Sequence, residues 1–393
     1  MISARNSWLW AAMLGLLGTL EVHATEPFLG ADLEAKIDAA AQREISTRKS
    51  AGVAVGVVRG GMLVFNRGYG LANVEMNAPV NGSTVFRLAS LTKQFTAADV
   101  LILVDQKKLS LDDKLSKFYP DFPRGGEVTI RHLLTQTSGV RDYLEVRIEE
   151  LWQRTWTHAD FVKHIADLGF DFDPGTHWHY TNSGYYLLGQ IIESVSGKSF
   201  ADFTRENIYS RLGMTDSSVD EEADVVPFRA SGYSQAEGTP SGFVNAPYIP
   251  MTVVYAAGAT RSTVSDLAKW NIALHGGKVT GPETFKLMMS EGRLNDGKLA
   301  RDAIFNPPGE TPHVPPPGFG PFGYTMGLHT GSVDGHRLVG HEGGIFGFNT
   351  MMENYVDDGF TLIVLANTEG GAGYLEVEIA RILFAAAKPA AKQ

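Results

Sequence analysis

Ser90 and Lys93 stand in the order Ser-x-x-Lys at the start of an apolar stretch. On a helix this spacing places both side chains on one face. A serine hydroxyl is a weak nucleophile until a base takes its proton. A lysine in apolar surroundings loses solvation, its pKa falls, and its neutral amine can be that base. The pair indicates nucleophilic catalysis, and the alternative is a helix-capping serine before a surface lysine.

A second group, Tyr-Thr-Asn at 180–182, follows a turn at 173–175 and precedes an apolar helix. A phenol can carry a proton between Ser90 and a leaving group if cations hold it near its anionic form. An amide both donates and accepts hydrogen bonds, so Asn182 suits both Lys93 and a substrate amide. The alternative is a buried Tyr180 beside a capping asparagine.

A third group, Gly-His-Glu-Gly-Gly at 340–344, is predicted on or beside a strand. His341 could hold a tyrosine anion or a substrate group. Gly343 and Gly344 leave room for a backbone to approach a ligand, and the N–H of Gly344 could complete an oxyanion hole with that of Ser90. The alternative is a glycine-rich hairpin turn.

The elements that must position these groups follow from hydrophobic periodicity and turn signals. The patterns predict strands over 51–58 and 62–68, helices over 91–106, 185–195, 200–212 and 264–274, strands over 324–330, 336–339, 346–353 and 360–366, and a closing helix over about 373–387. Strands at both ends with helices between them predict an α+β fold. We expect a largely antiparallel sheet built from both chain ends with flanking helices, an α/β lobe at about 25–90 and 255–390, and an inserted, mainly helical lobe at about 91–254.

The first 24 residues have the pattern of a secretory signal. Arg5 precedes an apolar run over 8–20, and Val22-His23-Ala24 offers small residues for a cut before Thr25. The run is shorter than the roughly 20 residues of a membrane span, and no later segment is long and apolar enough to span. We therefore expect a soluble mature chain of residues 25–393, periplasmic or secreted.

Composition excludes several classes of function. The formal charge of −10 disfavours nucleic acid and anionic lipid as partners. The absence of cysteine excludes disulfides, thiolate metal sites and a cysteine nucleophile.

Two further motifs have simpler explanations than ligand binding. Gly-x-Gly-x-x-Gly at 318–323 lies in a proline-rich loop with no strand before it and no helix after it, so we predict no dinucleotide site. His177 and His179 flank Trp178, but no second group of ligands stands at a suitable spacing, so we predict packing at a cleft edge and no metal.

In this order, the three groups resemble the motifs of the serine β-lactamase and penicillin-binding protein superfamily. The resemblance is to its class C β-lactamase-like branch, which includes DD-peptidases, D-aminopeptidases and esterases. Segments 84–89, 130–139, 185–189 and 340–348 also look typical, and the resemblance covers about residues 30–385.

The resemblance implies a hydrolase that works through an acylated Ser90. Lys93 and Tyr180 would act as bases, and the N–H groups of Ser90 and Gly344 would hold the oxyanion. The leaving group would take a proton by way of Tyr180, and water would then release the acyl group. Asn182, His341, Gly343 and Gly344 would bind the substrate, a small ester, peptide or β-lactam. No metal or organic cofactor is implied, and the oligomeric state stays open.

One departure bears on the substrate. Lactamases and carboxypeptidases of the superfamily usually have threonine where Glu342 stands and lysine where His341 stands. If Glu342 faces the cleft, its charge would repel an anionic substrate, and we expect neutral esters or amine-bearing peptides. The alternatives are a β-lactamase or DD-carboxypeptidase, a β-lactam receptor that stays acylated, a decayed homologue and a structural cell-wall protein.

Overall fold

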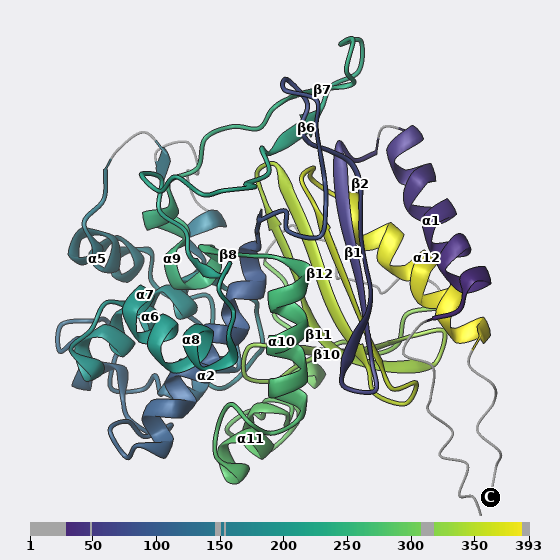
Figure 1. The fold of residues 1–393 in the computed structure, drawn as a ribbon. Coiled ribbons are helices and arrows are strands. Elements are labelled where there is room, and N and C mark those ends of the chain that lie inside the picture. The colour runs from purple at the N-terminus through teal and green to yellow at the C-terminus, as the bar shows by residue number, and fades with distance from the viewer. Residues whose placement is uncertain (1–28, 48, 146–150, 153–154, 308–317, 387–393) are drawn as a thin grey trace, which may run out of the picture.

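A computed structural model describes residues 29–47, 49–145, 151–152, 155–307 and 318–386 (Figure 1). A central sheet has two helices against one face and a larger helical layer against the other. The predicted signal segment lies outside the described residues. Within the described ranges, no helix has the length and apolarity needed to cross a bilayer.

The central sheet has eight strands in the order β3-β2-β1-β13-β12-β11-β10-β9, and every pairing is antiparallel. Its strands are β1 (Gly52–Arg59), β2 (Met62–Asn73), β3 (Ala78–Pro79), β9 (Gly323–Tyr324), β10 (His329–Val333), β11 (His336–Ile345), β12 (Phe348–Tyr355) and β13 (Phe360–Ala366). Because β1 pairs with β13, the two ends of the chain meet at the middle of the sheet. The predicted α+β fold with a sheet from both chain ends is confirmed.

Each face of the sheet has its own hydrophobic core. Along β1, Val53, Val55 and Val57 point into one core, while Ala54 and Val58 point into the other. This follows from the alternation of side chains along a strand. Because both faces are covered, β1 is a nearly continuous run of apolar residues.

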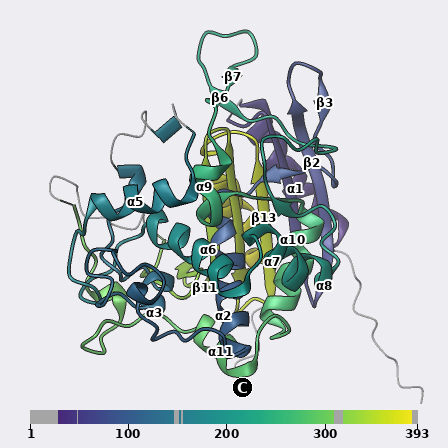
Figure 2. The same cartoon turned by 90° about the vertical axis from the view of Figure 1, so that its left-hand side faces the viewer.

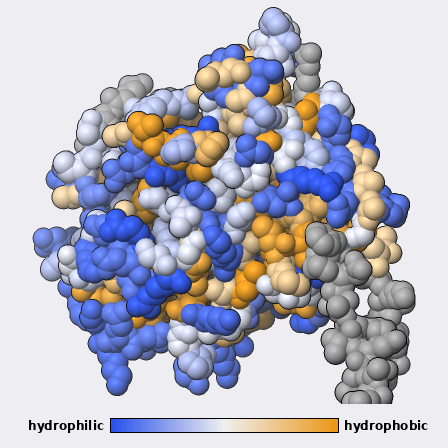
Figure 3. Space-filling view, in the orientation of Figure 1, coloured by the Kyte–Doolittle hydropathy of each residue, from blue (hydrophilic) through white to orange (hydrophobic). Residues whose placement is uncertain are grey.

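One face is covered by α1 (Ala31–Ser46) and α12 (Gly371–Ala386), which stand side by side at the right of Figure 1. The other face carries the remaining helices, which Figure 2 shows in front of the sheet. They are α2 (Thr92–Asp105), α3 (Ile130–Leu134), α5 (His158–Leu168), α6 (Asn182–Ser196), α7 (Phe200–Thr204), α8 (Ser210–Leu212), α9 (Met251–Gly258), α10 (Val264–His275) and α11 (Pro282–Met288). On the face shown in Figure 3, hydrophilic residues cover much of this layer, with smaller apolar patches between them.

The central helix of this layer is α2. Its first twelve residues are buried, and it contacts α6, α7, α9 and α11. A helix that is apolar on all sides is expected at such a position.

Five short strands form two small sheets. One contains β4 (Phe86–Arg87), β5 (Ser218–Val219) and β8 (Thr260–Ser262), and the other contains β6 (Tyr233–Gln235) and β7 (Phe243–Asn245).

Several predicted elements are confirmed, including the hairpin of β1 and β2 and the helices α2, α6, α10 and α12. Other predictions need correction. The expected strand over 324–330 is two strands, β9 and β10, because the chain turns between them at Gly327, where φ is +82°. A side chain there would lie 2.7 Å from the carbonyl oxygen of Lys93.

Two further predicted elements have other bounds in the structure, and one helix was missed. The expected strand over 336–339 continues to Ile345 as β11. The expected helix over 200–212 is interrupted by a π-helical turn, η4 (Arg205–Tyr209), between α7 and α8. Helix α1 was not predicted. The lobe boundaries near residues 90 and 254 stay a prediction.

Candidate active site

Ser90 lies on a short 3-10 turn, η1 (Ala89–Leu91), directly before α2. We expected Ser90 at the N-terminus of a helix over 91–106, and the structure places it there on a separate tight turn, with α2 itself beginning at Thr92. Ala89 has a φ of 50°, in the left-handed region that residues with a side chain rarely adopt. The backbone is held there because Leu88 N–H donates to the carbonyl of Thr260 at 2.8 Å. Ser90 is half-buried, whereas Ala89 and Leu91 are buried, so the turn directs the serine toward open space.

Lys93 is fully buried, and its Nζ has three partners. They are Ser90 Oγ at 3.0 Å, Asn182 Oδ1 at 2.8 Å and the carbonyl oxygen of Ala257 at 2.9 Å. Burial lowers the pKa of Lys93 to about 7, against a smaller opposing effect of Asp142. A large fraction of this amine is therefore unprotonated near neutral pH.

The carbonyl that reaches Lys93 is available because α9 is not a regular helix. Tyr255 within it has a φ of 37° and breaks the helical path. The next two carbonyls, of Ala256 and Ala257, accept hydrogen bonds from Thr96 and Lys93 on α2. The break thus satisfies two buried polar groups of α2.

Tyr180 lies against the same lysine, with Lys93 Nζ 4.7 Å from the centre of its ring. Its hydroxyl oxygen is buried and has no hydrogen-bond partner among the described residues. Burial raises the pKa of Tyr180 well above its usual range, Tyr324 adds to the shift, and Ser90 opposes it. Tyr180 is therefore a neutral phenol, and its buried hydroxyl lies close to Ser90.

His341 lies on β11 and is buried. Its Nδ1 is 2.5 Å from the carbonyl oxygen of Glu342, which can only accept, so Nδ1 carries the proton. Its Nε2 then accepts from the Tyr324 hydroxyl at 3.1 Å. Burial, helped by His329 and Lys93, lowers the pKa of His341 well below its usual range, so this histidine is uncharged at neutral pH.

Gly343 packs directly against the Ser90 turn. A side chain at this position would lie 2.1 Å from the carbonyl oxygen of Leu88 and 3.1 Å from the backbone nitrogen of Ser90. Only glycine permits this approach. At Gly344, one residue further along β11, a side chain would meet nothing within 4 Å.

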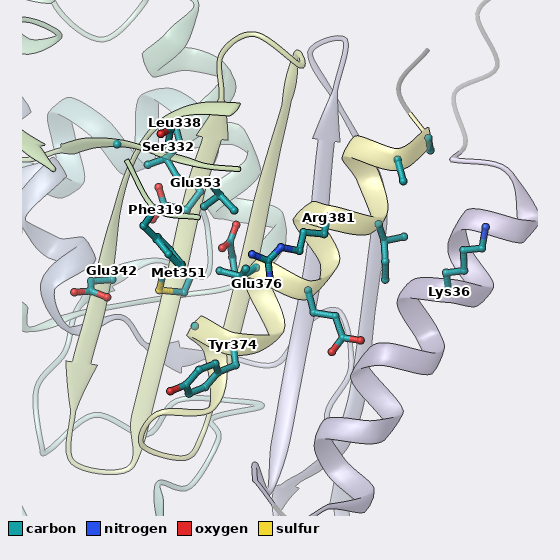
Figure 4. Close-up of a pocket in the computed structure, with 18 of the residues that line it drawn as sticks. Lys36, Phe319, Ser332, Leu338, Glu342, Met351, Glu353, Tyr374, Glu376 and Arg381 are labelled. Carbon is teal, nitrogen blue, oxygen red and sulfur yellow. The ribbon is translucent and has the colours of Figure 1, made fainter. Parts of the chain in front are cut away.

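Glu342 is exposed, and it lines the cavity at Ser90 as well as a second cavity next to α12. Side chains alternate along a strand, so Glu342 lies on the face of β11 opposite to His341 and Gly343. The second cavity has a volume of about 1450 Å³, and Met351 and Tyr374 also line it (Figure 4). The Glu342 side chain therefore borders the Ser90 cavity, where its charge adds to the effect of burial in raising the pKa of Tyr180, and the expected repulsion of an anionic substrate stays a prediction.

The hydroxyl of Ser90 opens into a cavity of about 1230 Å³. The predicted residues Tyr180, Asn182, His341, Gly343 and Gly344 also line it. Most of the remaining wall is apolar or aromatic: Tyr143, Leu144, Trp152, Trp178, Ile249, Val254, Ile304, Phe322, Tyr324, Ile345, Phe346 and Phe348. The structure thus brings the three predicted groups together at one cavity.

Sequence reasoning missed Asp142, Tyr324 and the Ala257 carbonyl. Asp142 lies in a loop and resembles any polar loop residue, and a backbone carbonyl has no sequence signal. Tyr324 was predicted within a strand, and only the turn at Gly327 brings it to the cleft.

His179 has closer partners than we expected. Its Nε2 lies 2.9 Å from Glu145 Oε1, and Asp171 completes a group with ligand atoms within 4.8 Å of one another. We predicted no second group of ligands at a suitable spacing from His177 and His179, and the fold brings two carboxylates, of Glu145 and Asp171, to His179. Asp171 already pairs with Arg141 Nε at 2.7 Å, so a network of ion pairs accounts for the cluster.

The protein has an antiparallel sheet covered by a helical layer, and its Ser90 is hydrogen-bonded to the buried Lys93. These features define its class as a serine hydrolase. The family model "Beta-lactamase" matches residues 33–387. The chain belongs to this family.

Relatives of this chain include enzymes and penicillin-binding proteins. Penicillin-binding protein 4* of Bacillus subtilis (strain 168) is 30% identical over 80% of this chain and 68% of its own length. Esterase EstB of Burkholderia gladioli is 33% identical over 50% of this chain and 55% of its own. The chain thus spans about two thirds of the first of these relatives and about half of the second.

A solved structure with the same fold is the D-amino acid amidase from Ochrobactrum anthropi SV3 complexed with D-phenylalanine. It is 25% identical, with a TM-score of 0.76, over 91% of this chain and 99% of that one.

Proposed function

We propose that this protein is an exported hydrolase that cleaves small esters or amides with apolar acyl groups through an acylated Ser90. The observation that carries the proposal is the contact of Ser90 with the buried amine of Lys93 at the edge of a largely aromatic cavity. An esterase and a D-amino acid amidase among its relatives support the same reaction class.

The hydrogen bonds of Lys93 determine the direction of proton transfer. A neutral amine has two N–H donors and one lone pair. Asn182 Oδ1 and the Ala257 carbonyl can only accept, so they take both donors. The lone pair is left for Ser90, whose hydroxyl then donates to Lys93 across 3.0 Å. Lys93 is thus the base that removes the serine proton as Ser90 attacks the substrate carbonyl.

Charge that develops on the substrate oxygen needs donors already in place. We assign this role to the backbone N–H groups of Ser90 and Gly344, because β11 packs against the Ser90 turn at Gly343. Tyr180 is neutral, so it supplies a proton to the leaving group and afterwards recovers one through Lys93. Water then attacks the acyl group and frees Ser90.

Charges around the cleft favour substrates without a carboxylate. His341 is uncharged, and Lys93 is occupied by Ser90, Asn182 and Ala257. Among the described residues that line the cavity, Arg301 is the sole arginine, and lysine is absent. The Arg301 guanidinium pairs with the Glu291 carboxylate at 3.0 Å. His329 also lines the cavity, and its Nε2 pairs with Glu353 at 2.9 Å. A penicillin or a peptide ending in D-alanine would therefore lack a free cation for its carboxylate.

Export is supported by the amino-terminal pattern of a charged residue at Arg5, the apolar run over 8–20 and a cleavage site before Thr25. Expression of the full chain in a bacterial host should yield a mature protein beginning at Thr25 outside the cytoplasm. Retention of Met1 on a cytoplasmic protein would contradict export.

A hydrolysis panel tests the substrate class. We expect clear turnover of p-nitrophenyl acetate and butyrate, turnover of D-aminoacyl amides, and low kcat/KM on benzylpenicillin, a cephalosporin and D-Ala-D-Ala peptides. Ser90→Ala supplies the blank, and Ser46→Ala, an exposed serine on α1, supplies the matched control. Rapid penicillin hydrolysis that depends on Ser90 would contradict the substrate class and leave the nucleophile in place.

A further inference from the structure

A buried carboxylate contacts Asn182, the residue whose amide oxygen binds Lys93. Asp142 is 5% exposed. Its Oδ2 accepts from the backbone N–H of Asn182 at 3.1 Å and from Asn182 Nδ2 at 2.9 Å, and its Oδ1 accepts from the backbone N–H of Leu144 at 3.1 Å. None of the three groups found in the sequence includes Asp142, which lies in the loop between α3 and the 3-10 turn η3 (Tyr143–Glu145).

These contacts determine which end of the Asn182 amide faces Lys93. A carboxylate accepts hydrogen bonds and donates none, so the NH₂ end of the amide must turn toward Asp142. The oxygen end then faces Lys93 Nζ at 2.8 Å. If the amide were reversed, its NH₂ group would donate to the lone pair of Lys93 and compete with Ser90.

We propose that Asp142 is a positioning residue that holds the Asn182 amide in the one orientation that leaves the Lys93 lone pair to Ser90. The inference rests on the proposed function, in which Lys93 is the base for Ser90. Asp142 touches neither Ser90 nor the cavity, so it acts through Asn182.

Asp142 also acts on Lys93 through its charge. The titratable groups that face Lys93 are Tyr180 and Tyr185, whose ring centres lie 4.7 and 5.6 Å from Nζ, together with His341 and Asp142. Burial raises the pKa of both tyrosines well above the usual range, and His341 is uncharged. Asp142 is thus the neighbour whose charge opposes the loss of the Lys93 proton.

The test is the pH profile of kcat/KM for p-nitrophenyl butyrate in Asp142→Asn. This substitution keeps the shape of the side chain and replaces one acceptor oxygen by a donor, so Asn182 loses its imposed orientation. We expect the plateau value of kcat/KM to fall about 10- to 100-fold. A loss of this size is typical when a residue that orients a functional side chain, or part of the acid–base catalysis, is removed. We also expect the ascending limb to move to lower pH, because a negative charge near Lys93 is removed.

Asp99→Asn is the matched control, because Asp99 is also buried, lies on α2 itself and bonds Thr204 rather than any residue of the site. Both the plateau and the limb should stay at their wild-type values in this variant. A limb of Asp142→Asn at the wild-type pH would overturn the inference, even with a reduced plateau, because a purely structural defect lowers the rate and leaves the limb in place.

A neutron structure of the Ser90→Ala protein, which distinguishes the nitrogen from the oxygen of an amide, gives a second readout that requires no change at Asp142. We expect Asn182 Nδ2 within hydrogen-bond distance of Asp142 and Asn182 Oδ1 within that distance of Lys93. An amide bonded the other way, or an Asp142 turned aside, would overturn the inference. Failure of the proposed function is distinguishable, since wild-type protein would then show no Ser90-dependent ester hydrolysis at all.

Discussion

At the scale of single residues, the environment of Lys93 controls the chemistry. The side chain lies among two tyrosine rings, an amide oxygen and a carbonyl oxygen rather than in water, and burial lowers its pKa to about 7. Asn182 and Ala257 would stabilise a charged amine, yet two acceptors do not replace full hydration. The same lysine on the surface would stay protonated and could not activate Ser90.

The first prediction concerns pH. We expect kcat/KM for a neutral ester to rise with pH and to level off above an apparent pKa of about 7, because Lys93 acts once it has lost its proton. Lys93→Arg should lower kcat/KM by about 10²- to 10⁴-fold at every pH, since a guanidinium stays charged. Lys108→Arg, an exposed lysine beyond the end of α2, is the control and should match wild type. A wild-type profile that stays flat from pH 5 to 9 would exclude Lys93 as the base.

Part of this site is predictable from local sequence and part is not. The spacing of Ser90 and Lys93 is short enough that one turn of chain brings them together, so the pair is visible in the sequence. Asp142 and Tyr324 reach the site through loops, and nothing in their neighbourhood along the chain marks them. The orientation of Glu342 depends on which face of β11 meets Ser90, and the motif alone does not decide that.

At the scale of elements, the site forms where β11 crosses the Ser90 turn. The strand supplies His341, Gly343 and Gly344 within four residues, and its pleat points the first two toward the turn. The turn is rigid because β4 pairs with β8 on one side and α2 begins on the other. Partners that are distant in the sequence hold both β11 and the Ser90 turn, so the contact between the two forms only in the folded chain.

The second prediction tests this contact. Gly343→Ala should destabilise the fold by about 1–3 kcal/mol, because the new methyl group would overlap the Leu88 carbonyl and must push β11 from the Ser90 turn. Thermal unfolding measures the loss, and ester hydrolysis should fall with it. Gly344→Ala is the matched control for folding, since a methyl group there meets no atom within 4 Å. Equal melting temperatures for the two variants would show that β11 does not press on the turn.

Element prediction succeeded where one residue pattern dominates and failed where tertiary contacts decide. The apolar run of α2 predicts a buried helix, and the alternation of small and branched residues along β1 predicts a strand. The single strand expected over 324–330 instead breaks at Gly327, because the chain there must pass close to the backbone of Lys93. The 3-10 turn at Ser90 likewise reflects packing against Thr260 and Gly343 rather than local propensity.

At the scale of the whole molecule, one antiparallel sheet separates two cores. The chain ends build the core with α1 and α12, and the middle of the chain builds the core around α2. The site lies at the border of the sheet and the second core. Lys93 is therefore as buried as the apolar residues around it, and keeping it there has a cost in stability.

The third prediction is the pH dependence of this cost. The pKa of Lys93 is about 7 in the folded chain and 10.5 for a free lysine, so the unfolded chain binds more protons between these values. The free energy of unfolding should therefore rise with pH across this window. Lys93→Met removes this contribution, so its stability relative to wild type should be highest below about pH 7 and decline by at most about 4–5 kcal/mol toward pH 10.

Chemical denaturation of both proteins at several pH values measures this difference. Other titrating groups are common to the two proteins and cancel. Methionine leaves Asn182 Oδ1 and the Ala257 carbonyl without a donor, which shifts the whole curve equally at all pH values. Parallel stability curves for wild type and variant would mean that burial does not lower the pKa of Lys93.

The most direct test of the central claim is the intact mass of the protein during a short pulse of p-nitrophenyl acetate. We predict a mass increase of one acetyl group, located on the peptide that contains Ser90, which disappears as the substrate is consumed. Ser90→Ala should gain no mass and release no p-nitrophenol above the uncatalysed rate. An acetyl group that never leaves would indicate a receptor rather than an enzyme. Hydrolysis by Ser90→Ala at the wild-type rate would contradict the account.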